Sequence, residues 1–406
     1  MKFTITELYF YIILFFPITT LFQDYIDGLN RLAFIFLFLI QTILFTKRIR
    51  KKTLWVTMVM MVNYLYSLMV THGSPDNLND LFYFPFSIIF MLYISENMGL
   101  IDNFLERKRV FVQRILGAWN VLVFLSLLLP SSYGAGWGGS KYFTSFCGSV
   151  FRLAPTAIFI MSLALCAMVY YKERKYFAYT LFPLVTIYMG GSRTYLLVAL
   201  ALFMIVWYFF LSSKRLFFLS MLPLGGILIG AISISSMGDK LLATSYTADS
   251  YFDFWGTISS GRTVFWAAEV EAFKECGIIQ KLLGGGYNYI YDINEAVVQA
   301  RIWAHNDFLN LLIGNGIVGL GLYLYAVKEI FNNIKEGLEN KQCGWIPIMG
   351  CFAVWFINAM FNMFYTYFCA LLAFPLLICA VYKKCDMGRE EDASKDERYS
   401  HCNLPL

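Results

Sequence analysis

The sequence predicts an all-α polytopic membrane protein with about twelve transmembrane helices and one long external (periplasmic or extracellular) loop that contains short helices. Its 406 residues are 59% hydrophobic and only 15% charged, whereas a soluble domain is typically about 45–50% apolar and about 25% charged. Apolar runs long enough to cross the roughly 30 Å of a hydrocarbon core as helices recur along the whole chain. Lys and Arg residues collect in alternate connections between these runs, as in a multi-pass protein with a fixed orientation.

Twelve apolar runs are candidate membrane helices. The run at 176–189 is short for a full span, so it is either tilted against its neighbours or paired as a re-entrant element. The tenth run is apolar from Phe308 to Val327 apart from two asparagines, which predicts one continuous helix about 30 Å long. The predicted spans cover residues 7–22, 32–46, 54–70, 81–95, 115–130, 153–171, 176–189, 195–212, 216–234, 307–328, 344–360 and 365–382.

The distribution of positive charge predicts the orientation of these spans. All but nine of the 32 Lys and Arg residues fall on one side of the membrane when the runs are threaded in order. Positive charge marks the cytoplasmic side, so both termini are expected in the cytoplasm. An even number of spans also requires both termini on one side.

This topology divides the chain into four parts. Five of the nine external basic residues lie in the one long loop, which is therefore expected to carry the function. We expect N-terminal transmembrane helices over 1–234, an external catalytic and substrate loop over 235–304, C-terminal transmembrane helices over 305–384 and a cytoplasmic tail over 385–406.

Inside the loop, residues 261–275 predict a helix. Helical spacing puts Trp266, Val270 and Phe273 on one apolar face. Three glycines at 284–286 end this part and open a flexible aromatic turn. The opposite face of the helix is expected to turn to water with Glu269, Glu271 and Lys274.

Two external arginines lie where a helix is expected to begin. Arg193 stands in MGGSRTYLL at a membrane boundary, where an arginine costs free energy unless it is paired or solvated. It is either a snorkelling anchor, with Ser192 or Thr194 as a helix cap, or a ligand for an anion. Arg262 has similar surroundings in ISSGRTVFW, and a guanidinium can bind two phosphate oxygens at once.

His305 is the third candidate, at the expected level of the lipid head groups. A histidine there can exchange protons near neutral pH. The alternative is an interfacial histidine at a helix start, with Asn306 or Asp307 as the N-cap. The charge-based topology places His305 on the same membrane face as Arg193 and Arg262, and this agreement indicates a common site.

The sequence argues against a cofactor or metal site. G-N-G-I-V-G at 314–319 fits the dinucleotide-binding pattern, but no strand precedes it and close helix packing by small residues explains it better. His72 and His401 have no plausible partners for a metal site. No external Asp-x-Asp pair suggests a metal-bound nucleotide sugar, so we expect neither metal nor cofactor.

Three motifs resemble those of one bacterial family. The stretch HNDFLNLLIGNGIVGLGLYLY, at 305–325, is similar to a pattern of the O-antigen ligase and O-antigen polymerase superfamily. Gly190 to Thr194 and Ser260 to Trp266 resemble the other two motifs, in the family's order. The resemblance covers about 190–330 and points to a surface polysaccharide polymerase-like protein.

The resemblance implies a metal-independent, inverting glycosyltransferase that uses undecaprenyl-diphosphate-linked glycans at the outer face of the inner (plasma) membrane. It implies that Arg193 and Arg262 bind the donor's diphosphate and that His305 is the base for the acceptor hydroxyl. Aromatic rings of the loop could stack on sugars, although an interfacial aromatic belt would use the same residue types. Further candidates for substrate binding are Arg152, Arg301, Ser192, Ser260, Tyr287 and Trp303.

The predicted function is polymerisation of the repeat units of an O-antigen, capsule or exopolysaccharide. A ligase that moves the finished glycan to lipid A core or another acceptor is the alternative. A transporter or flippase is disfavoured because the spans hold almost no ionisable residues. The expected partners are the lipid-linked oligosaccharide and the bilayer, with a chain-length regulator protein as an optional third; no nucleic acid is expected.

Overall fold

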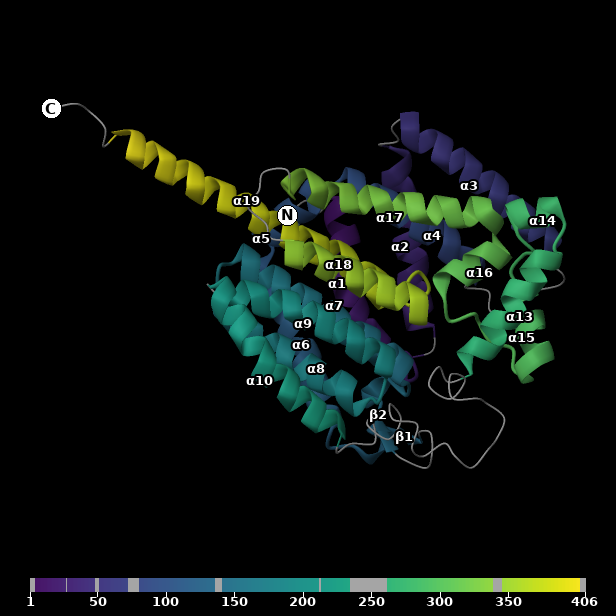
Figure 1. Ribbon diagram of the computed structural model, residues 1–406, viewed down its shortest axis with the longest axis horizontal. Coiled ribbons are helices and arrows are strands. Elements are labelled where there is room, and N and C mark those ends of the chain that lie inside the picture. Colours follow the sequence, from purple (N-terminus) through teal and green to yellow (C-terminus); the bar gives the residue numbers. More distant parts are fainter. Residues whose placement is uncertain are drawn as a thin grey trace.

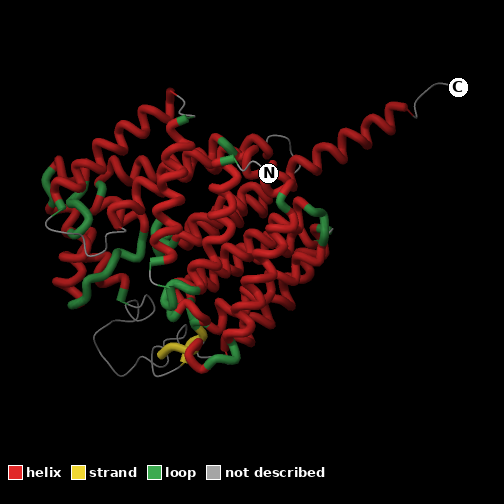
Figure 2. The backbone as a smooth tube through the Cα atoms, turned by 180° about the vertical axis from the view of Figure 1, so that it is seen from behind, coloured by secondary structure: helices red, strands yellow, loops and turns green. Residues whose placement is uncertain are grey.

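The computed structural model is an assembly of helices with one small strand pair (Figures 1 and 2). It describes residues 4–26, 28–47, 51–71, 80–135, 141–211, 213–233, 261–338 and 345–401. The helices of the first half are α1 (Ile5–Leu21), α2 (Leu29–Thr46), α3 (Lys51–Val70), α4 (Asp80–Glu96), α5 (Met98–Arg107) and α6 (Arg109–Ser126). After them come two strands, β1 (Tyr133–Ala135) and β2 (Lys141–Phe143), which pair antiparallel.

The second half continues the helical pattern. Its first helices are α7 (Val150–Tyr170), α8 (Ala178–Met189), α9 (Arg193–Phe210) and α10 (Lys214–Ser233). The long loop contributes α13 (Arg262–Glu275), α14 (Ile278–Leu283) and α15 (Tyr289–Val298), and the chain ends with α16 (Asp307–Gly314), α17 (Gly316–Leu338), α18 (Trp345–Phe361) and α19 (Phe368–His401). Three-residue and four-residue 3₁₀ turns occupy Pro130–Ser132, Ser145–Cys147 and Arg174–Phe177.

The all-helical membrane fold predicted from the sequence is confirmed, because every predicted span overlaps one of these helices. Six of the described helices are long and apolar enough to cross a membrane, or seven if the bent pair α4 and α5 is one span. The helices α1 and α18 are apolar but shorter. The number of about twelve spans stays a prediction.

Helix α7 is at the centre of the packing. It is buried over almost its whole length and lies against α19, α8 and α9. Small residues such as Ala157, Ala164 and Ala167 line it and are fully buried, which lets neighbouring helices approach closely. The helices of the long loop, α13, α14 and α15, lie at one end of this bundle together with α16 (Figure 1).

The prediction of one continuous helix over 307–328 is wrong. Helix α16 ends at Gly314 and α17 begins at Gly316, whose φ of +71° is in the left-handed region. Backbone polar groups freed at membrane depth need partners inside the protein. The amides of Gly285 and Gly286 supply them by donating to the carbonyls of Ile313 (2.7 Å) and Gly314 (3.1 Å).

Helix α3 completes this arrangement. The side-chain amide of Asn63 donates to the carbonyls of Asn315 (2.7 Å) and Leu283 (3.2 Å). The Asn315 side chain donates in turn to Asn63 and to Ser67, both at 3.2 Å. We call these contacts between 284–286, 314–316 and α3 the glycine junction. Its glycines are therefore used for close backbone contact, as the small-residue interpretation of 314–319 predicted.

We predict that a methyl group at the glycine junction destabilises the protein. A Cβ on Gly284 would lie 2.2 Å from the carbonyl oxygen of Gly314, and Gly284 has a φ of +94°. Gly284→Ala should therefore cost about 1–3 kcal/mol or more and lower the melting temperature of the detergent-purified protein. Gly321→Ala, in open space on α17, is the matched control. Equal melting temperatures for the two variants would contradict the close packing described here.

Candidate active site

Two helix starts meet at the carboxyl end of α18. Arg262 is the first residue of α13 and follows Gly261, whose φ of +81° turns the chain into the helix. Its guanidinium donates to the carbonyl of Phe361, the last residue of α18. The hydroxyl of Thr194, in the first turn of α9, donates to the same carbonyl at 3.4 Å. A helix's carboxyl end is partly negative, which favours a cation there.

The second arginine lies close to this point. Arg193 is the first residue of α9, directly before Thr194. Burial and, to a smaller degree, the charge of Arg193 lower the pKa of Arg262 to about 10. Arg262 therefore stays protonated at neutral pH. Among the residues that the structure describes, it forms no ion pair with a carboxylate, so two positive charges share one region.

The segment before α16 carries His305 to the same region. His305 has a φ of +49°, in the left-handed region. The indole nitrogen of Trp266, one turn after Arg262 on α13, donates to the carbonyl of Ala304 at 2.6 Å. The ring of Trp266 lies 6.3 Å from that of Phe361. Trp266 thus fixes the His305 segment against α13 and the end of α18.

The imidazole of His305 is neutral at physiological pH. Burial, followed by the charge of Arg262, lowers the pKa of His305 to about 4. Its Nδ1 is buried and finds no hydrogen-bond partner within the described part of the chain. The structure therefore brings all three of the principal candidates, Arg193, Arg262 and His305, into electrostatic contact.

Helix capping at this point belongs to Asn306. Its side-chain oxygen accepts a hydrogen bond from the amide of Leu309 at 3.1 Å, as an N-cap does. Of the two predicted caps, Asn306 is confirmed and Asp307 is not. Asp307 instead accepts from the hydroxyl of Tyr323 at 2.6 Å and is fully buried. His305 takes no part in the cap.

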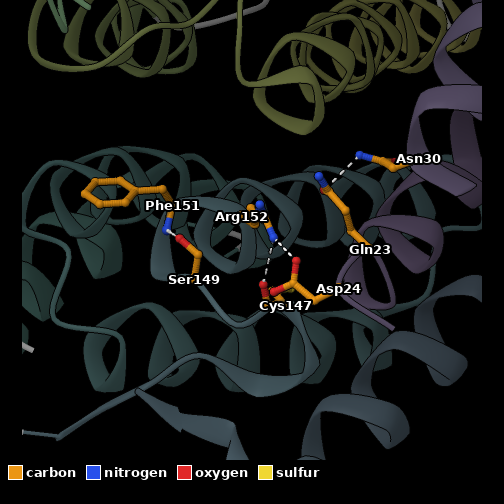
Figure 3. A network of polar contacts seen from close by, with 7 residues as sticks. All are labelled: Gln23, Asp24, Asn30, Cys147, Ser149, Phe151 and Arg152. Atoms are coloured by element: carbon orange, nitrogen blue, oxygen red, sulfur yellow. Dashed lines mark hydrogen bonds and ion pairs between the residues drawn. The ribbon is translucent and has the colours of Figure 1, made fainter. Parts of the chain in front are cut away.

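Two of the other predicted substrate ligands are held in ion pairs. Arg152 donates to the carboxylate of Asp24 and, at 3.4 Å, to the carbonyl of Cys147 (Figure 3). Arg301 pairs with Asp292 (3.1 Å) and with Glu295 on α15. Carboxylates therefore already balance the positive charges of both arginines.

The remaining candidates divide into three groups. Ser192 is the N-cap of α9, next to Arg193, and Ser260 lies outside the described residues. Tyr287 and Trp303 line one small pocket together with Tyr291, Asn310, Asn315 and Tyr365. In it, the Trp303 ring lies 5.5 Å from that of Tyr291.

The prediction that Glu269 faces water is wrong. Glu269 is fully buried and Val270 is exposed, because α13 turns the face with Phe265 and Glu269 towards α15. Burial raises the pKa of Glu269 to about 7, and the nearby side chain of Asn294 partly opposes this rise. The amide of Asn294 donates to the carbonyl of Ile302 at 2.9 Å.

Sequence reasoning missed several residues that position the site. Glu269 was assigned to solvent, Asn294 was not singled out, and Trp266 was assigned only to an apolar face. Trp266 and Asn294 together hold the backbone at 302–304, directly before His305. The available signal was that Trp and Asn both carry side-chain donors, which need acceptors wherever they are buried.

Comparison with known families agrees with the three motifs. The model of a family described as O-antigen ligase matches residues 178–324, a range that contains Arg193, Arg262 and His305. The resemblance drawn from the motifs is thereby confirmed. No curated protein matches the chain.

The lowered pKa of His305 predicts a specific pH dependence of stability. The unfolded side chain titrates near 6.5 and the folded one near 4, so the unfolded state binds more protons between these values. The wild type should lose about 1–3 kcal/mol of stability from this residue as the pH falls from 7 towards 4. His305→Gln should lose correspondingly less, which melting temperatures measured across this pH range would reveal.

Asn306→Ala is the control for that experiment. Loss of the cap should lower stability by about 0.5–2 kcal/mol, equally at every pH. If the stability of His305→Gln changed with pH as much as that of the wild type and of Asn306→Ala, the buried neutral histidine would be disproved.

Proposed function

We propose that this chain, whose residues 178–324 match a family described as O-antigen ligase, polymerises undecaprenyl-diphosphate-linked repeat units of a surface polysaccharide. Family members are enzymes of the glycosyltransferase type. The observation that carries the proposal is the meeting of two guanidinium groups and one neutral imidazole at the end of α18. These groups suit a reaction whose leaving group is an anion and whose nucleophile must lose a proton.

The proposed reaction is one displacement at the anomeric carbon of the donor. The acceptor hydroxyl oxygen forms the new bond to this carbon while the bond to the diphosphate oxygen breaks, and the diphosphate leaves with the electron pair. His305 takes the hydroxyl proton. Because attack and departure occur on opposite faces of the sugar, the anomeric configuration inverts.

Arg193 and Arg262 would stabilise the departing diphosphate. Charge grows on the leaving group as the bond breaks, and preorganised cations at that position lower the barrier most effectively. Arginine is suited to this because it stays protonated even when buried, as Arg262 does. The two side chains can thus supply the charge stabilisation that a divalent metal supplies in other transferases, so the proposed mechanism is metal-independent.

Ligation of a finished glycan to lipid A core or another acceptor is the second candidate, and the family description favours it directly. The donor, leaving group and base are common to both reactions, which differ only in the acceptor. An assay that offers both a second lipid-linked repeat unit and a lipid A core acceptor therefore separates them. Product on the core acceptor alone would replace polymerisation by ligation.

We predict that Arg193→Lys and Arg262→Lys each lose most activity. Lysine keeps the charge but lacks the planar fork that binds two phosphate oxygens. A lost charge-assisted contact costs about 1.5–3 kcal/mol, or roughly 10–100-fold in rate. Arg152→Lys, whose charge is paired with Asp24 outside the site, should retain activity. The measurement is polymer formation from a purified lipid-diphosphate-linked repeat unit, and normal activity of both site variants would remove the diphosphate role.

The base is tested by two substitutions of His305. Neither Ala nor Gln can accept a proton near pH 7, so both variants should lose about 10²–10⁴-fold in turnover. Asn306→Ala should leave turnover per folded molecule near that of the wild type, because the Asn306 side chain caps α16 and contacts the sulfur of Met360, both of which are structural contacts. A His305→Gln variant with wild-type turnover would exclude the histidine from the mechanism.

The proposed location is the inner (plasma) membrane, with both termini in the cytoplasm and the loop outside, where it could also meet a chain-length regulator. An exposed position on α13 tests this orientation. A single cysteine at Glu271, whose side chain is 61% exposed, should react with an impermeant reagent in intact cells, whereas one at Lys47 should react only after permeabilisation. The reverse pattern would overturn the orientation and the external site.

A further inference from the structure

Helix α14 exposes more apolar surface than a water-facing loop would. Ile278, Ile279 and Leu282 are 79%, 65% and 45% exposed, so half of this six-residue helix presents large apolar side chains outward. A contiguous apolar patch on a soluble surface marks a contact with a membrane or a protein. The neighbouring contacts of α14 decide which of these fits.

Helix α14 packs against α17 and against α3, which is one of the candidate membrane spans (Figure 1). The side chain of Asn63 on α3 donates to the carbonyl of Leu283, the last residue of α14. Four residues later, the amide of Tyr287 donates to the hydroxyl of Thr71, just beyond the end of α3, at 3.1 Å. The chain therefore rises along α3 between these two contacts.

The position of Asn63 gives the depth of α14. It lies seven residues before Val70, which is about 10 Å along the helix axis from that end. The apolar window of α3 runs from Thr53 to Val70, about 27 Å of helix, so its end at Val70 lies near the boundary of a roughly 30 Å hydrocarbon core. The end of α14 is thus below this boundary, inside the core.

The outward face of α3 shows what surrounds α14 there. Val62, Leu65 and Met69 are apolar and exposed, which on a membrane-spanning helix means contact with lipid. Helix α14 packs against α3, so at the depth of Asn63 its own exposed apolar residues would meet the same surroundings. Lipid is therefore the occupant that the position favours over a protein partner.

We propose that α14 inserts into the bilayer leaflet on the side of the candidate active site, with Ile278, Ile279 and Leu282 against lipid acyl chains. The loop of 235–304 is then not wholly external, because α14 is a re-entrant element within it. Only Cys276 and Gly277 separate α14 from α13, so the inserted helix anchors the element that carries Arg262 and Trp266 at the membrane surface. This inference does not depend on the reaction proposed above.

Spin labels in the full-length protein in liposomes test the insertion. Single cysteines replace Ile279, Leu282, Met69 and Glu271 in a chain whose native cysteines are changed to serine. Oxygen, which partitions into lipid, should relax the labels at 279 and 282 as strongly as the label at 69. A water-soluble nickel chelate should relax only the label at 271.

Two results would overturn the proposal. Labels at 279 and 282 as accessible to the nickel chelate as the label at 271 would place α14 in water. Immobilised labels protected from both reagents would place it in a protein interface. Ile279→Trp, measured against Glu271→Trp in the otherwise native chain, checks the same point without cysteine replacement, because brominated lipids should quench only the added fluorescence at 279.

Discussion

The need to satisfy backbone hydrogen-bonding groups away from water governs the C-terminal half of this protein. Breaking a helix at Gly314 to Gly316 frees amides and carbonyls at membrane depth, where each one left unpaired costs several kcal/mol. The protein meets this need with the amides of Gly285 and Gly286 and with the side chain of Asn63. The break is consequently also the point at which the long loop, α3 and the two halves of the tenth predicted span are joined.

That joint has consequences for the candidate site. Because the loop is held at 284–286, its α15 and the segment after it lie against α13, and Trp266 and Asn294 fix the backbone before His305. On the other side of the site, the carbonyl of Phe361 at the carboxyl end of α18 accepts hydrogen bonds from Arg262 and Thr194. His305 and the two arginines therefore lie on separate segments of the chain. Hydrogen bonds from side chains to backbone carbonyls hold these segments in place relative to one another.

The sequence predicted the helices well, and it predicted that the three principal candidate residues lie near one another, because both features leave signals that can be read from short segments of the chain. Apolar runs mark helices wherever they pack, and the charge bias put Arg193, Arg262 and His305 on one face without any tertiary information. The break inside 307–328 left no such signal, because the mean hydropathy of a segment is the same whether its helix is continuous or broken. Its partner Asn63 lies 252 residues away from Asn315. The ion pair of Arg152 with Asp24, 128 residues apart, escaped prediction for the same reason.

The error over Glu269 has a different cause. A helical wheel assigns a carboxylate to water on the assumption that the helix has one neighbour and that this neighbour is apolar. Helix α13 has α15 beside it, and α15 offers Asn294. A carboxylate and an amide can therefore share a buried interface that no single-helix pattern reveals. Trp266 was placed on the correct helix, but its hydrogen bond to Ala304 depended on a loop whose path the sequence does not indicate.

The electrostatics of the site link donor binding to the strength of the base. Without an anion, burial and the charge of Arg262 both hold the pKa of His305 near 4, so the ring is neutral but weakly basic. In the proposed function, the diphosphate of the donor lies against Arg193 and Arg262 and offsets their charge. The contribution of Arg262 then diminishes while the larger contribution of burial remains, so the pKa of His305 rises part of the way towards the range in which a general base is most effective. Arg262, which in the proposed function holds the leaving group, would thereby also make the histidine a weaker base until a donor is bound.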